Sequence, residues 1–61
     1  MIKQILGAEI VRYQDSGQVI AYVLWKDDRD QRGTTSGDPE GGHMRALLAR
    51  AERERVRVYE R

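Results

Sequence analysis

The sequence predicts an α+β fold of ββαβ order, in which an antiparallel hairpin and a short third strand carry one amphipathic helix on one face of the sheet. Residues 8–26 contain two stretches rich in β-branched and aromatic residues around an Asp-Ser-Gly turn, which indicates a hairpin. The second half of the chain has apolar residues at the spacing of one helix face. They are Met44, Leu47, Leu48 and Ala51. With 61 residues and no cysteine, the chain is expected to form one small domain without disulfide bonds.

The hairpin turn is predicted at residues 15–17. Asp bonds readily to the backbone two residues on, and glycine accepts a positive φ. A three-residue loop would pair Val11 with Ala21, whereas a two-residue loop would shift the register by one and regroup the faces of the first strand. Residues 1–7 fit a strand start, a helical turn or a frayed end.

Residues 27–37 contain no apolar side chain, and we expect a flexible polar loop there. Asp28 and Asp30 match the first and third positions of a calcium loop. The fifth position is then Arg32 and the twelfth is Pro39, neither of which supplies the oxygen ligand that a calcium loop needs. The sequence therefore predicts no metal site.

A helix is predicted over residues 38–55. Asp38 suits the N-cap, and Pro39 suits the first helical position. The two glycines that follow each lower helix stability by about 1 kcal/mol relative to Ala, so His43 is an alternative start. After the helix, valines alternate with other residues at a period of two, which predicts a short third strand over 56–60.

The second strand of the hairpin is apolar on both sides, although one helix covers only one face of a small sheet. One side carries Val19, Ala21, Val23 and Trp25, and the other carries Ile20, Tyr22 and Leu24. We therefore expect a non-enzymatic protein-binding module that packs its second apolar face against another copy in a homodimer, or against a larger protein. The expected contact residues are Tyr13, Ile20, Tyr22, Leu24 and Trp25.

The charge of the chain is segregated, although its net value is only +1. Residues 27–42 hold five acidic residues and two arginines, whereas residues 43–61 hold six arginines and three glutamates. The alternative prediction is nucleic-acid binding through a stripe of arginines on one helix flank and the third strand. These are Arg45, Arg50, Arg53 and Arg57. The low net charge and the neighbouring acidic residues favour protein binding.

No feature of the sequence predicts an active site, a cofactor or a small-molecule substrate. His43 is the only histidine, and the chain offers it no cysteine and no Gly-x-Ser-x-Gly motif. Segment 33–42 lacks the lysine of a phosphate-binding loop. The apolar run 19–25 is too short to cross a membrane and the N-terminus lacks an export-signal pattern, so we expect a cytoplasmic protein.

The segment SGDPEGGHMRALLARAERERV resembles C-terminal stretches of short, uncharacterised proteins of proteobacterial phages and prophages. In those proteins an Asp-Pro opening leads into a compact amphipathic helix. The matching residues are Gly37, Asp38, Pro39, His43, Met44, Leu47 and Leu48. The resemblance implies a small accessory protein of a mobile element, a group that includes inhibitors of host proteins, anti-CRISPR proteins among them. It carries over no catalytic residue.

Overall fold

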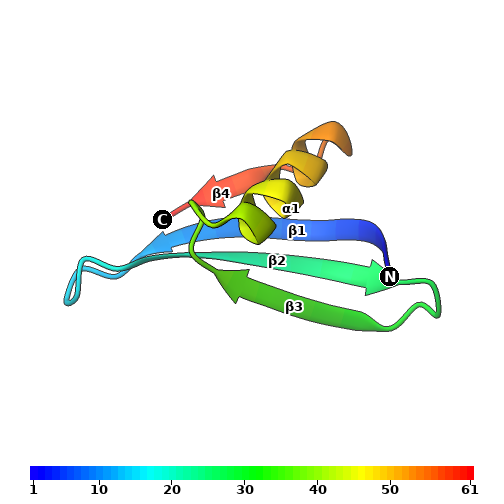
Figure 1. Cartoon of the computed structure of the whole chain (residues 1–61), viewed down its shortest axis with the longest axis horizontal. Coiled ribbons are helices and arrows are strands. Elements are labelled where there is room, and N and C mark those ends of the chain that lie inside the picture. The colour runs from blue at the N-terminus through cyan, green and yellow to red at the C-terminus, as the bar shows by residue number, and fades with distance from the viewer.

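The computed structural model describes all 61 residues as one four-stranded mixed sheet with a single helix (Figure 1). The elements are β1 (Ile2–Arg12), β2 (Val19–Asp27), β3 (Arg32–Gly37), α1 (Gly42–Arg53) and β4 (Val58–Glu60). The strand order is β3-β2-β1-β4, with β4 parallel to β1 and the other neighbours antiparallel. The predicted α+β class is confirmed: a hairpin, a further strand after the helix, and one helix packed against the sheet.

The register of the hairpin differs by one residue from the register that a three-residue loop would give. Ile10 lies opposite Ala21, so the pairing of Val11 with Ala21 that a three-residue loop would give is wrong. The turn spans residues 14–17 and is closed by two backbone bonds of 2.8 Å, from the Tyr13 N–H to the Gln18 carbonyl and from the Gly17 N–H to the Tyr13 carbonyl. Gly17 adopts a φ of 71°, where glycine is favoured. The N-terminal residues left open by the sequence belong to β1, which begins at Ile2.

Strand β1 is irregular near its start and is held there by the helix C-terminus. Its register with β2 shifts between Ile5 and Gly7. The Ile5 N–H donates to Glu54 Oε1 at 2.9 Å, and Arg50 Nη2 donates to the Lys3 carbonyl at 3.0 Å. Two backbone groups of β1 are therefore satisfied by side chains from the last turn of α1 and the residue after it.

The expectation of a flexible loop over residues 27–37 is wrong for its second half, because Arg32–Gly37 forms β3. Only the tight turn after β2 is a loop. There the Asp27 carboxylate accepts the N–H groups of Arg29 at 2.8 Å and Gln31 at 2.9 Å, and Asp30 adopts a φ of 61°. The segment forms a strand without apolar residues because β2 offers it a paired backbone edge.

Trp25 of β2 covers one face of β3. Its Nε1 donates to Thr35 Oγ1 at 2.8 Å, and its ring lies over Gly33 so closely that a Cβ at that position would be 2.5 Å from two ring carbons. The next glycine on the same face, Gly37, lies under Met44 of the helix. Close packing therefore requires glycine at position 33, whereas a Cβ at Gly37 would lie 3.2 Å from Met44 Cγ and call for only a small shift.

The helix starts later than residue 38. Asp38 caps a turn instead: its Oδ1 accepts the Glu40 N–H at 2.9 Å, and its carbonyl accepts the Gly41 N–H at 2.9 Å. Helix α1 begins at Gly42, with Gly41 at the N-cap and no side-chain cap bond. It ends at Arg53 rather than 55, and the strand predicted over 56–60 is shorter, covering Val58–Glu60.

The core lies between α1 and one face of the sheet. The helix contacts β1, β2 and β4 (Figure 1). Seven apolar residues are buried there: Ile5, Ala8, Ala21, Val23, Met44, Leu47 and Ala51. Three of the four residues of the predicted helix stripe are among them, and Leu48 packs at the margin. No helix of the chain is both long enough and apolar enough to span a bilayer.

We predict that Gly33→Ala destabilises the fold by about 1–3 kcal/mol, because the added methyl group displaces a tryptophan ring that is already hydrogen-bonded. Gly7→Ala is the matched control, since nothing lies within 4 Å of a Cβ there. Urea unfolding followed by Trp25 fluorescence measures both. Equal midpoints for the two variants would contradict the packing of Trp25 on β3.

Candidate functional site

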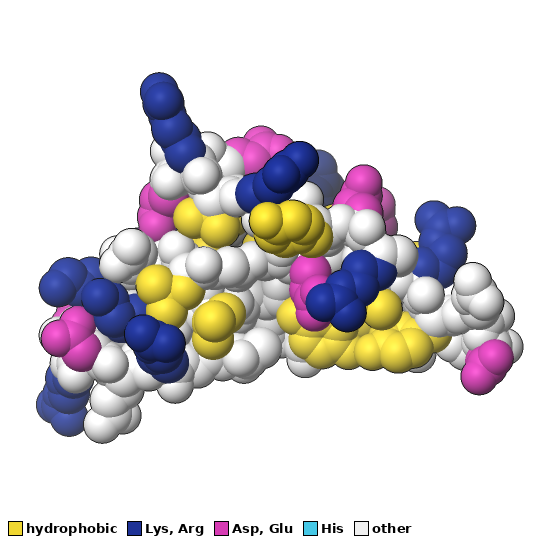
Figure 2. Space-filling model, turned by 180° about the vertical axis from the view of Figure 1, so that it is seen from behind, with side chains coloured by type: hydrophobic (Ala, Val, Ile, Leu, Met, Phe, Trp, Pro, Cys, Tyr) yellow, Lys and Arg dark blue, Asp and Glu magenta, His cyan; other side chains and the backbone are white.

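The sheet face opposite α1 is covered by no other element, and we call it the open face. Alternation along the strands and the pairing register assign its residues. They are Glu9, Val11 and Tyr13 from β1 and its turn, Ile20, Tyr22, Leu24 and Lys26 from β2, Arg32, Thr34 and Ser36 from β3, and Tyr59 from β4. Seen from behind, hydrophobic side chains gather in groups across the molecule below the helix, with charged groups between them (Figure 2).

The large side chains of the open face are accessible in the single chain. Leu24 is 39% exposed, Tyr13 is 41% exposed and Tyr59 is 58% exposed. Ile20 and Tyr22 are half-buried. All seven fully buried residues are apolar and none is Ile20, Tyr22 or Leu24, so the second apolar side of β2 remains uncovered.

Two tyrosines of the open face are linked. The hydroxyl groups of Tyr13 and Tyr22 lie 2.6 Å apart. The pKa of Tyr22 is raised, first by this hydrogen bond, then by desolvation and by the negative charges that Tyr13 and Glu9 can carry. The hydrogen bond also holds the two rings together, which lowers the entropy lost when a partner packs on them.

A shallow hollow of about 380 Å³ lies on the open face and is lined by residues of all four strands. It is lined by Gly7, Ala8, Glu9, Tyr22, Leu24, Thr34 and Tyr59. Gly7 lies opposite Leu24 in the register and, having no side chain, leaves space beside it. Glu9 is the one charged residue of the lining, and its carboxylate pairs with Arg61 at 3.1 Å.

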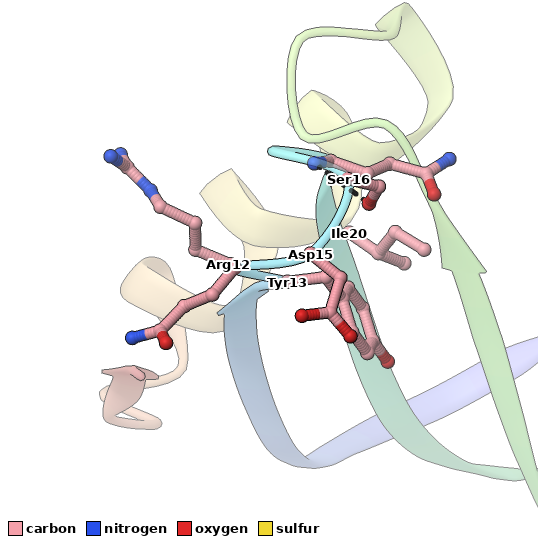
Figure 3. A pocket seen from close by; sticks show the side chains of 7 residues that line it. Arg12, Tyr13, Asp15, Ser16 and Ile20 are labelled. Atoms are coloured by element: carbon pink, nitrogen blue, oxygen red, sulfur yellow. Dashed lines mark hydrogen bonds between the residues drawn. The ribbon is translucent and has the colours of Figure 1, made fainter.

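A second shallow hollow, of about 490 Å³, lies at the hairpin end of the open face. Its labelled lining residues are Arg12, Tyr13, Asp15, Ser16 and Ile20, and the Arg12 side chain points away from Ile20 (Figure 3). The turn is fixed locally, since Ser16 Oγ accepts the Gln18 N–H at 3.2 Å. This hollow extends the accessible surface from the two tyrosines to the tip of the hairpin.

The structure brings four of the five predicted protein-binding residues together. Tyr13, Ile20, Tyr22 and Leu24 share the open face. Trp25 does not join them, because it lies on the helix side, where it packs on β3. Sequence reasoning missed Tyr59 and Glu9. Their alternation was visible, but only the parallel pairing of β4 with β1 places them side by side.

The four arginines of the predicted stripe differ in their contacts. Arg50 is committed to the fold: its Nε lies 2.6 Å from Glu54 Oε2, and its Nη2 reaches the Lys3 carbonyl. Arg45 and Arg53 are exposed and form no ion pair. The Arg57 guanidinium lies 5.5 Å from the centre of the Tyr59 ring, at the border of the open face.

The candidate chemical groups named from the sequence lie apart from one another. His43 is exposed at the start of α1 and has no hydrogen-bond partner on its side chain. No group of three or more His, Cys, Asp or Glu side chains is placed to hold a metal ion. The open face carries aromatic rings, aliphatic side chains and a few hydroxyl groups.

Comparison with known proteins adds no family: no family model, no curated protein and no solved structure matches this chain. The surfaces described above are therefore interpreted from their own geometry.

We predict that stability falls at acidic pH through Glu54. Its pKa is lowered, first by the Ile5 N–H and then by the Arg50 pair, so the stabilisation is present above the unfolded-state value of about 4.3 and is lost as pH falls through the lower folded-state pKa. Glu54→Gln should unfold at lower urea concentration than the wild type at pH 7, and the difference should shrink below about pH 4.

Glu52→Gln is the control, because the Glu52 side chain forms no ion pair or hydrogen bond in the structure. Its difference from the wild type should stay small at both pH values. A Glu54→Gln effect that is the same at pH 3 and pH 7 would show that the carboxylate charge does not hold the start of β1.

Proposed function

We propose that this chain is a small non-enzymatic protein-binding module that docks its open face on an apolar surface of another protein. The observation that carries the proposal is the uncovered second side of β2, with Leu24 and Tyr13 exposed beside the half-buried Ile20 and Tyr22. Monomeric domains expose few contiguous apolar patches, and those that they do expose are commonly interaction sites.

The composition of the open face supports a protein partner. Tyrosine is enriched among residues that dominate interface energy, and three tyrosines lie on this face. Among its charged groups, Glu9 is paired with Arg61 and Lys26 with Asp30, and Arg32 lies at the first residue of the outermost strand. A partner can therefore cover the centre of the face without leaving an unpaired charge.

The resemblance of the helix segment to phage and prophage accessory proteins supplies the proposed setting. A chain of this size that buries an exposed sheet face on a host protein can block the surface that it covers. We therefore propose an inhibitor or adaptor encoded by a mobile element, of the kind that includes anti-CRISPR proteins, acting in the cytoplasm. The partner is a larger host protein; a second copy of this chain is the alternative occupant of the face.

We predict that Leu24→Glu lowers affinity for the open-face partner at least about tenfold, because a carboxylate is then buried against an apolar surface. Leu24 is the best position for this test, since Gly7 and Thr34 lie opposite it, whereas a carboxylate at Tyr22 would face Glu9 and weaken the sheet itself.

Ala46→Glu is the matched control, because Ala46 is exposed on the helix. Both variants are used as baits in host lysate, and captured proteins are quantified by mass spectrometry. Capture of the same partners by wild type and Leu24→Glu would refute the open face as the binding site. Loss of self-association in Leu24→Glu by light scattering would identify the second copy as its occupant.

The alternative function, nucleic-acid binding, is favoured by one observation: Arg45 and Arg53 are exposed without ion pairs, and Arg57 stands beside Tyr59. Phosphate contacts of this kind weaken steeply with salt. Because Arg50 is engaged by Glu54 and the net charge is +1, we predict no gel shift of single- or double-stranded DNA or RNA at low salt. A salt-sensitive shift that Arg45→Ala and Arg53→Ala remove would establish this function instead.

A further inference from the structure

The outer edge of β3 is unpaired in the single chain. The strand order puts β3 at one end of the sheet, and the helix packs mainly on the other strands, meeting β3 at Gly37 through Met44. The Asp27 N–H donates to the Gln31 carbonyl at 2.9 Å. Together with the register, this bond shows which residue pairs of β2 and β3 are hydrogen-bonded to each other. Because antiparallel pairing alternates, Gly33, Thr35 and Gly37 direct their N–H and C=O groups toward β2. Those of Arg32, Thr34 and Ser36 point away from the sheet.

Nothing in β3 protects this edge. Natural sheets blunt exposed edges with proline, lysine, bulges or a covering element. Strand β3 has no proline, pairs with β2 without a register shift, and carries one charge, Arg32, at its first residue. Trp25 and Met44 pack on its glycines from the helix side and leave its outer edge uncovered.

The charges around β3 are complementary to those of a second copy. Arg32 at the start of the strand forms no ion pair. Asp38 and Glu40, just after its end, also form no ion pair. Two copies related by a twofold axis pair antiparallel, which brings the start of each strand to the end of the other. Each Arg32 then faces the acidic end of its partner.

One register satisfies both the backbone and the charges. With Thr35 of each copy on the twofold axis, Thr34 faces Ser36 of the other copy, so residues with outward-pointing N–H and C=O groups are paired. The same register sets Arg32 opposite Asp38. It also sets Gly33 opposite Gly37, so the Trp25 ring over one glycine lies beside the Met44 side chain over the other.

We propose that this protein forms a twofold dimer by antiparallel pairing of β3 with β3 of a second copy, which joins the two sheets into one and leaves both open faces free. The proposal is independent of the open face and its function. Six residues of strand per copy make a small interface, below about 1,200 Å², so a weak dimer is expected, with a dissociation constant in the range of about 10–1,000 µM.

Sedimentation equilibrium across this concentration range tests the dimer, with Ser36→Pro as the disrupting variant. Proline removes the outward N–H that the neighbouring strand needs, and it is tolerated at edge positions whose N–H faces solvent. Ser36→Ala keeps that N–H and is the matched control. Ser36→Pro is expected to be monomeric throughout, and Ser36→Ala to associate like the wild type.

Arg32→Glu is a second variant that leaves the pairing of β3 with β2 intact, since Arg32 forms no ion pair in the single chain and lies opposite Lys26, to which a glutamate is opposite in charge. It replaces an attraction to Asp38 and Glu40 with a repulsion in both halves of the interface. We expect it to weaken the dimer about tenfold at low salt and less at high salt.

Amide hydrogen exchange gives a residue-level readout. In the dimer the N–H groups of Thr34 and Ser36 should become protected as concentration rises, while that of Thr35 is protected at every concentration. Three results would overturn the proposal: a monomer at millimolar concentration, exchange at Thr34 and Ser36 that does not change with concentration, or a dimer that Ser36→Pro retains and Leu24→Glu dissociates.

Discussion

A single helix of 12 residues has to cover a sheet that runs most of the length of the molecule. The helix is about 18 Å long, whereas the molecule extends 38 Å along its longest axis. It therefore covers the middle of one face, over β1, β2 and β4, and buries only seven residues completely. On the near face the helix meets β3 at Gly37, through Met44. The far face and the outer strand edge are beyond its reach, and these are the surfaces on which the proposed interactions depend.

Two sets of side-chain contacts hold parts of the sheet that the helix itself does not cover. Trp25 lies over β3 where no helix reaches, and the glycine beneath it allows ring and backbone to approach closely. On β1, whose Ile5 lies opposite Trp25, Arg50 and Glu54 act together: one binds the Lys3 carbonyl and the other accepts the Ile5 N–H. Both sets of contacts satisfy polar groups, which matters in a chain that has no disulfide and a small core.

The open face and the outer edge of β3 have different physical characters. The open face offers aromatic and aliphatic area, for which a partner supplies complementary shape. The edge offers backbone hydrogen bonds and two opposed charges, for which an antiparallel strand is the natural complement. Because they lie at right angles on the sheet, one surface can be occupied without hiding the other. A dimer joined at the edges would present two open faces to a larger partner and gain affinity through the linkage.

The sequence by itself determined the elements that have a local periodicity. The hairpin, the apolar stripe Met44, Leu47 and Ala51, and the two apolar sides of β2 were all readable, because side-chain direction follows backbone period. Four of the expected contact residues share one face for the same reason.

Tertiary structure alone decided the rest. Residues 32–37 have no apolar signal and became a strand only because β2 offered a backbone edge and Trp25 covered them. Because Trp25 packs on β3 in this way, it is part of the folded interior and not of the expected binding surface. Tyr59 lies on the open face because β4 pairs with β1. Arg50 is not free in the arginine stripe, because it donates a hydrogen bond to the Lys3 carbonyl 47 residues away. Each of these depends on partners distant in sequence, and local periodicity carries no information about them.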